Sequence, residues 1–164
     1  MLYGAVLLWV NLYIGRDLFF AEYTGHSNSV HGLWMSMARL AGEHWFRPSW
    51  WPYFDGGIPF EHAYMPLIPA LTAVSAKLSG ASVAHAFNMI TGLAYCLGPL
   101  ALFAMAFVLT RSPGYSFWAA LFYSLTSTAR AIVWDDTPLE VSLTLLTLAV
   151  LFMWLSLTSR KRTN

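Results

Sequence analysis

The segment from residue 25 to residue 69 gathers side chains that could do chemistry. It contains four of the five histidines of the chain, together with carboxylates, tryptophans, prolines and glycines at turn spacing. Imidazoles and arginines bind phosphate or relay protons, and carboxylates act as bases. Because this polar, turn-rich segment lies between apolar stretches, we expect the functional site here.

The composition is that of an integral membrane protein. Hydrophobic residues make up 57% of the 164 residues and charged residues only 10%, whereas a soluble domain is about half apolar and about a quarter charged. A net charge of +1, with no basic cluster larger than residues 160–162, argues against nucleic-acid binding. The single cysteine, Cys96, excludes a disulfide framework and a cysteine metal site.

Uncharged apolar windows predict the membrane spans, since a crossing helix needs about 20 mostly apolar residues. The fold class expected is all-α integral membrane, a single membrane domain over 1–164 with about four transmembrane helices. The first is short and lacks the basic start and cleavage site of a signal peptide. The predicted spans are residues 1–14, 86–110, 115–129 and 139–157.

The basic residues predict the orientation of these spans. Arg160, Lys161 and Arg162 should face the cytoplasm, and two crossings earlier Arg111 falls on the same side. Both termini are then cytoplasmic, and residues 15–85 form a long external loop on the inner membrane. Residues 64–78 are too short and proline-rich to cross, so we expect them to lie at the membrane interface or to re-enter the membrane without crossing.

Residues 28–41 should form a second amphipathic helix in the external loop. Apolar side chains recur at spacings of three and four, and Asn28, His31 and Arg39 are assigned to the opposite side. Such a helix should lie along the bilayer surface. The polar side could simply be solvated, or it could bind phosphate or relay protons. The apolar face consists of Val30, Leu33, Trp34, Met37, Leu40 and Ala41.

An aromatic, turn-rich stretch follows over residues 45–64. The run from Asp55 through Gly56 and Gly57 predicts a tight turn that presents polar groups beside ring faces. The rings could form an interfacial belt, or they could serve with nearby carboxylates as a platform for a sugar. The candidate sugar ligands are Asp55, Glu61, His62 and Tyr64.

Several short motifs occur in the order found in a family of bacterial membrane proteins. They are Gly25-His26, His31, Arg47-Pro48-Ser49-Trp50, Gly56-Gly57-Ile58-Pro59 and Tyr64-Met65-Pro66-Leu67. Over about residues 15–110 the chain resembles the proteins labelled 6-pyruvoyl-tetrahydropterin synthase-related, which are similar to the GT-C superfamily of membrane glycosyltransferases. The resemblance implies transfer of a sugar from a polyprenyl-phosphate donor, with the active site in the first external loop.

The chain departs from that family where an acidic residue should follow Gly25-His26, because it has Ser27 there. A serine cannot act as the carboxylate base or metal ligand. Either a nearby carboxylate, Asp17 or Glu22, replaces it, or the protein binds without catalysing. The resemblance places a second acidic site in the next external loop, where Asp135 and Asp136 stand. These two could instead be helix-start residues before Pro138.

The resulting hypothesis gives each candidate residue a role. Asp136 or Glu22 would act as the base or bind a divalent cation, with Asp135 beside Asp136, and Arg39, His26 and His31 would contact the leaving phosphate. The full substrate-binding set is His26, Asn28, His31, Arg39, Asp55, Glu61, His62 and Tyr64.

GT-C enzymes carry many more helices than four, so we expect the chain to be an N-terminal fragment or a reduced homologue. The missing helices would come from a longer parent chain or a membrane partner. The alternative is a noncatalytic polytopic module that binds a lipid-linked sugar or a partner subunit in the bilayer. The sequence identifies neither the sugar nor its acceptor.

Overall fold

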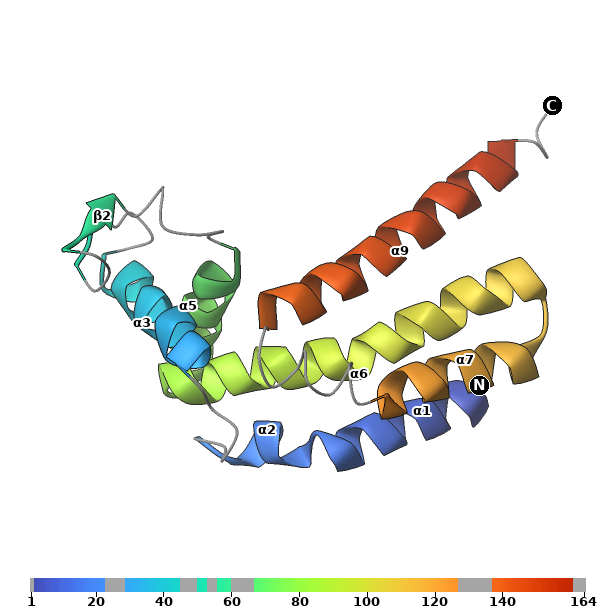
Figure 1. Ribbon diagram of the computed structural model, residues 1–164, viewed down its shortest axis with the longest axis horizontal. Helices are drawn as coiled ribbons and strands as arrows, with labels where there is room; N and C mark the ends of the chain where they lie inside the picture. The colour runs from blue at the N-terminus through green and yellow to red at the C-terminus, as the bar shows by residue number, and fades with distance from the viewer. Residues whose placement is uncertain are drawn as a thin grey trace. The chain divides into compact units, whose positions relative to one another are not determined.

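The structure is a computed structural model that describes residues 2–22, 29–44, 50–52, 56–59, 67–126 and 137–160. These residues are almost entirely helical, which confirms the all-α class (Figure 1). One short antiparallel hairpin pairs β1 (Trp50–Trp51) with β2 (Ile58–Pro59). The helices are α1 (Leu2–Ile14), α2 (Arg16–Phe20), α3 (Ser29–Glu43), α5 (Leu67–Ser79), α6 (Val83–Thr110), α7 (Pro113–Leu125) and α9 (Thr137–Arg160).

Two helices are long and apolar enough to cross a membrane, α6 and α9. With 28 and 24 residues they reach about 42 and about 36 Å, against a hydrocarbon core of about 30 Å. α1 and α7 have 13 residues each, about 20 Å. The described helices therefore provide two of the four expected spans at full length.

The surface of α9 is apolar, as expected of a helix that faces lipid. Its large apolar side chains point outward along most of its length, which would be costly in water and suits contact with lipid. The exposed set includes Leu145, Leu146, Phe152, Met153, Trp154 and Leu155.

The chain, expected as one membrane domain, divides into two compact units. Unit 1 comprises residues 1–16 and 91–164, and unit 2 comprises residues 17–90. Helix α6 begins in unit 2 and continues into unit 1. In unit 2, α5 and the start of α6 follow α3 and the hairpin along the chain, whereas unit 1 holds α1, α7 and α9.

Polar side chains link the helices of unit 1. The Thr91 and Thr137 hydroxyls lie 3.0 Å apart and join α6 to α9. The Tyr95 hydroxyl of α6 donates to the Ser124 carbonyl of α7 at 3.1 Å. All four residues are buried, and interhelical hydrogen bonds between small polar residues are a common means of association in membrane helices.

The turn between α6 and α7 contains a strained residue. Arg111 has φ 56°, in the left-handed region that costs an L-residue about 1–2 kcal/mol and that glycine occupies freely. Its amide still donates to the Phe107 carbonyl at 2.9 Å. Ser112 then takes the N-cap position and Pro113 opens α7, where the fixed proline φ suits the first helical residue.

Unit 2 is built on the packing of α3 against α5. A Cβ at Gly42 of α3 would lie 3.7 Å from the Ala73 Cβ of α5, so small residues bring the two backbones close. The helix expected over 28–41 runs from Ser29 to Glu43, and the helix expected over 64–78 runs from Leu67 to Ser79.

A buried amide fixes the start of unit 2 to α6. Asn88 donates through Nδ2 to the carbonyls of Ala21, at 3.2 Å, and Glu22, at 3.0 Å. The side chain of Asn88 is 2% exposed. It satisfies two carbonyls that follow the short helix α2 and would otherwise need water or another donor.

Candidate functional site

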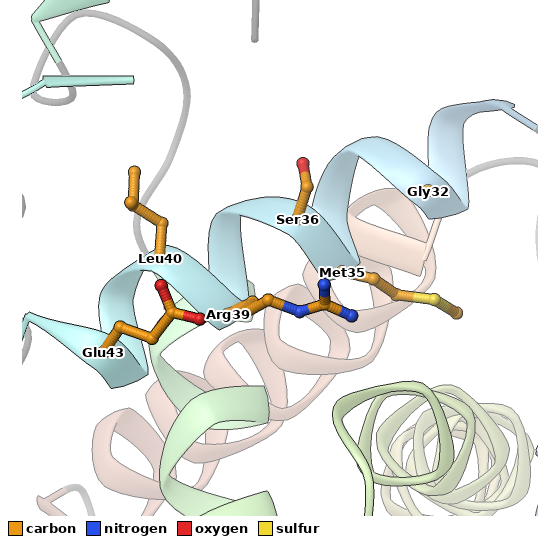
Figure 2. A pocket seen from close by; sticks show the side chains of 6 residues that line it. All are labelled: Gly32, Met35, Ser36, Arg39, Leu40 and Glu43. Carbon is orange, nitrogen blue, oxygen red and sulfur yellow. The ribbon is translucent and has the colours of Figure 1, made fainter. Parts of the chain in front are cut away.

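One cavity near the expected site lies on the outer side of α3. Its volume is about 390 Å³. The apolar half of α3 is buried, as amphipathic spacing predicts, and the cavity therefore forms over the remaining surface. Figure 2 shows the side chains that line it, all from α3: Gly32, Met35, Ser36, Arg39, Leu40 and Glu43.

Arg39 is the cationic group of this cavity. It is exposed and forms no hydrogen bond or ion pair with any of the residues that the structure describes. Glu43 stands one turn later, but the guanidinium extends toward Met35 rather than toward that carboxylate (Figure 2). A planar guanidinium with unused donors can bind a phosphate through two parallel hydrogen bonds.

Ser36 places a second polar group in the same cavity. Its hydroxyl donates to the Leu33 carbonyl at 2.7 Å, so the oxygen offers lone pairs, and those would suit a hydroxyl donor. Met35 and Leu40 supply apolar surface beside it. The cavity thus combines a cation, the Glu43 carboxyl group, a hydroxyl acceptor and apolar contacts, a set that suits a polar headgroup carried on a hydrophobic chain.

A second cavity lies between α3 and α5, with a volume of about 290 Å³. Arg39 lines both cavities, and Lys77 of α5 lines only this one. Small residues form most of its remaining wall, namely Ala38, Gly42, Ala73 and Ala76. Two cations from two helices and the Glu43 carboxyl group therefore border one groove, and the rest of its wall is small and apolar.

The outer side of α5 is apolar. Leu67, Leu71, Val74 and Leu78 are 49, 42, 39 and 84% exposed, and they recur at spacings of four, three and four, which places them in one row along the helix. A row of this kind on a surface helix is typical of an element that inserts into the boundary of a bilayer.

The placement expected for His31 on the polar side of its helix is wrong. His31 is only 4% exposed, and its ring lies 5.5 Å from that of Phe87 in a tilted arrangement. It stands three residues before Trp34 and seven before Ala38, both buried, so helical geometry puts it on the packed face. His31 lines neither of the two cavities that Arg39 borders.

The hairpin presents one tryptophan and buries the other. Trp50 is 50% exposed, whereas Trp51 is 1% exposed. Gly56 and Gly57 have φ of 80° and 99°, as the predicted tight turn requires. The Trp50 ring covers the Gly57 backbone so closely that a Cβ there would lie 2.7 Å from Cε2. The exposed ring could serve as the aromatic platform inferred from the sequence.

Of the candidate catalytic carboxylates, the structure describes Asp17, in the first turn of α2, and Glu22, which follows α2; both are exposed. Within the described ranges no three metal-binding side chains come together. The other predicted site residues lie outside the described residues: His26, Asn28, Asp55, Glu61, His62, Tyr64, Asp135 and Asp136.

The structure also reveals a buried carboxylic group that the sequence reasoning did not select. Glu140 has no exposed surface, and neither carboxyl oxygen has a hydrogen-bond partner among the described residues. The sequence carries a signal for it, because Glu140 is the only acidic residue of α9. An ionisable residue inside a membrane helix is a functional candidate by default.

Comparison of the chain with protein-family models, with curated proteins and with solved structures finds no match.

Proposed function

We infer that the chain is part of a membrane glycosyltransferase of the GT-C type, which takes a sugar from a polyprenyl-phosphate donor on the external face of the inner membrane. The observation that carries this proposal is Arg39, a guanidinium without a partner among the described residues, in a cavity that also offers a hydroxyl and apolar surface. A lipid-linked sugar phosphate combines the same three chemical features.

The apolar row on α5 supports a location at the membrane surface. Burying side chains such as Leu71 and Leu78 in the bilayer boundary removes apolar area from water at about 25 cal/mol per Å². Because α5 packs against α3, insertion of the row would bring Arg39 to headgroup depth, where a donor phosphate resides. Trp50 would offer a ring face to the sugar.

The proposal includes four spans with both termini in the cytoplasm. α1 and α7 are short, so they would cross together with residues that flank them. The orientation is testable at the two ends of α6, Ser82 and Ser112. In a Cys96→Ser background, a membrane-impermeant maleimide should label Ser82→Cys on intact cells and Ser112→Cys only after permeabilisation. The reverse pattern would contradict the orientation.

Binding of the donor phosphate can be measured with the full chain reconstituted in vesicles, with a polyprenyl monophosphate as the probe. Arg39→Gln should weaken binding about ten- to a hundredfold, because a hydrogen bond to a charged group contributes about 1.5–3 kcal/mol. Arg111→Gln makes the same charge change in unit 1 and should leave binding unaltered. Equal losses of binding in the two variants would show that binding depends on the net charge of the chain and not on the position of Arg39.

The variant Lys77→Gln shows which of the two cavities binds the phosphate. Lys77 lines only the groove between α3 and α5, so a loss as large as that of Arg39→Gln places the phosphate in that groove. A negligible loss places it over the outer side of α3.

Catalysis is a separate measurement. The full-length parent, incubated with a polyprenyl-phosphate-linked sugar, should transfer the sugar to an acceptor hydroxyl and release polyprenyl phosphate. Changing Asp135 and Asp136 to Asn in that parent should reduce the release by orders of magnitude. The alternative, a noncatalytic module, is favoured by Ser27 in place of the expected acid. Binding that depends on Arg39 without any release of polyprenyl phosphate would establish the module and refute the enzyme.

A further inference from the structure

Glu140 lies where three helices of unit 1 meet. An alanine Cβ placed at Gly98 of α6 would be 3.3 Å from Glu140 Oε1, 3.0 Å from Thr144 Oγ1 and 3.8 Å from Tyr123 Cε1 of α7. The carboxyl group of α9 therefore sits against the bare backbone of α6, beside a hydroxyl of its own helix and the ring of a tyrosine. Its side chain is fully buried, with no hydrogen-bond partner for either oxygen among the described residues.

No counter-charge is available from the helices around it. α7 contains no charged residue, and α9 contains none after Glu140 until Arg160 at its end. α6 has no Lys, Arg, Asp or Glu, and its one histidine, His85, stands 13 residues before Gly98, about 20 Å along the helix. The titratable group of these helices that interacts electrostatically with Glu140 is the Tyr123 phenol, which is itself neutral at physiological pH.

Two electrostatic effects compete at this position. Glu140 is in the first turn of α9, where the helix dipole favours a negative charge by about 0.3–1 kcal/mol, and by at most about 2 kcal/mol. Burying an ionised carboxylate without a partner costs several kcal/mol. The desolvation cost exceeds the dipole effect, so the neutral acid is the more stable form.

We propose that Glu140 is a proton-binding site within the helices of unit 1, a carboxylic acid that keeps its proton at neutral pH. The Thr144 hydroxyl lies near this carboxyl group, because both oxygens fall within 3.3 Å of the Cβ position at Gly98. This inference is independent of the glycosyltransferase proposal.

Infrared difference spectroscopy of the full chain in vesicles at pH 7 tests the site directly. The spectrum of the wild type minus that of Glu140→Gln should contain the C=O stretch of a protonated carboxyl group, which shifts in D₂O. The matched variant Glu43→Gln removes an exposed side-chain carboxyl group of α3 and should remove no such band. Absence of the protonated band from the Glu140 difference spectrum would overturn the proposal.

Labelling with the hydrophobic reagent dicyclohexylcarbodiimide distinguishes a proton from an alkali cation. The carboxyl oxygen adds to the carbodiimide carbon and its proton passes to a nitrogen, so only the protonated acid reacts readily. Mass spectrometry should find the adduct on Glu140 at pH 7, equally in sodium and choline buffers. Protection by sodium alone would assign the site to sodium and refute the proton. Folding of each variant is checked by protection of the buried Cys96 thiol.

Discussion

Replacing Gly98 by alanine should destabilise unit 1, although alanine is the better helix former. At an unobstructed helix position the change from glycine to alanine stabilises by about 0.5–1 kcal/mol. At Gly98 the new methyl group would lie 3.0 Å from Thr144 Oγ1 and 3.3 Å from Glu140 Oε1. Both side chains are buried, so neither moves freely, and overpacking of this kind costs about 1–3 kcal/mol.

Gly4 provides the matched control. It lies inside α1, and no atom lies within 4 Å of its Cβ position, so Gly4→Ala should gain the helical preference without the clash. The free energies of unfolding of the two variants then differ by the cost of overpacking alone, about 1–3 kcal/mol. For a chain of this size the difference corresponds to about 2–12 °C in Tm.

The chain carries its own reporter for this measurement. Cys96 is its only cysteine and is 2% exposed, so a maleimide dye that fluoresces on reaction records unfolding in detergent as the temperature rises. Thr144→Ala removes the hydroxyl that lies nearest the new methyl group. When Gly98→Ala is added to Thr144→Ala, the further loss of stability should therefore be much smaller than the loss that Gly98→Ala causes in the wild type. If Gly98→Ala is as stabilising as Gly4→Ala, the packing described around Glu140 is wrong.

Three further predictions use the same thermal assay, or proteolysis where the effect is local. Asn88→Asp keeps the shape of the side chain but removes the donor to two carbonyls, so it should destabilise the fold by about 2–3 kcal/mol; an unchanged Tm would contradict these two hydrogen bonds. Gly57→Ala should expose the hairpin to protease, because the Trp50 ring and the positive φ both resist a side chain, and protection equal to the wild type would refute this. Thr91→Val and Thr137→Val should show a coupling energy of about 0.5–1.5 kcal/mol in a double-mutant cycle, since their hydroxyls bond to each other; additive effects would exclude that bond.

Local sequence patterns predicted the positions of the helices better than the contacts between helices. Residues 28–41 and 86–110 were expected to be helical from apolar periodicity and from the absence of charge, and the structure has helices over Ser29–Glu43 and Val83–Thr110. Both patterns reside in the helix itself. The contact between Gly42 and Ala73 depends on the approach of two helices, which small residues permit but do not specify.

The placement of His31 shows how a residue type can mislead. Imidazole was grouped with the polar residues, yet its spacing from Trp34 and Ala38 already puts it on the packed side of α3. A histidine can be buried beside a ring such as that of Phe87. Position on the helix was the better predictor, and the chemical character of the side chain was the weaker one.

The candidate site was predictable only in part. Arg39 was expected on the exposed side of its helix, where the structure has it, because it stands opposite the apolar spacing. The burial of Glu140 could not be read from α9 alone, since it depends on the missing side chain at Gly98 of another helix. The bond from Asn88 to Ala21 and Glu22 joins residues 66 and 67 positions apart, which no local pattern predicts.

The strained turn at Arg111 bears on how the protein enters the membrane. Glycine would relieve about 1 kcal/mol at this position, yet the chain carries a long cationic residue there. In the orientation proposed above, a positive charge after α6 would hold that end of the helix on the side of synthesis during insertion, and glycine supplies no such signal. Arg111→Gly should therefore yield a chain that is more stable once folded but inserted with mixed orientation. At this residue the demands of biogenesis and of the finished structure are opposed.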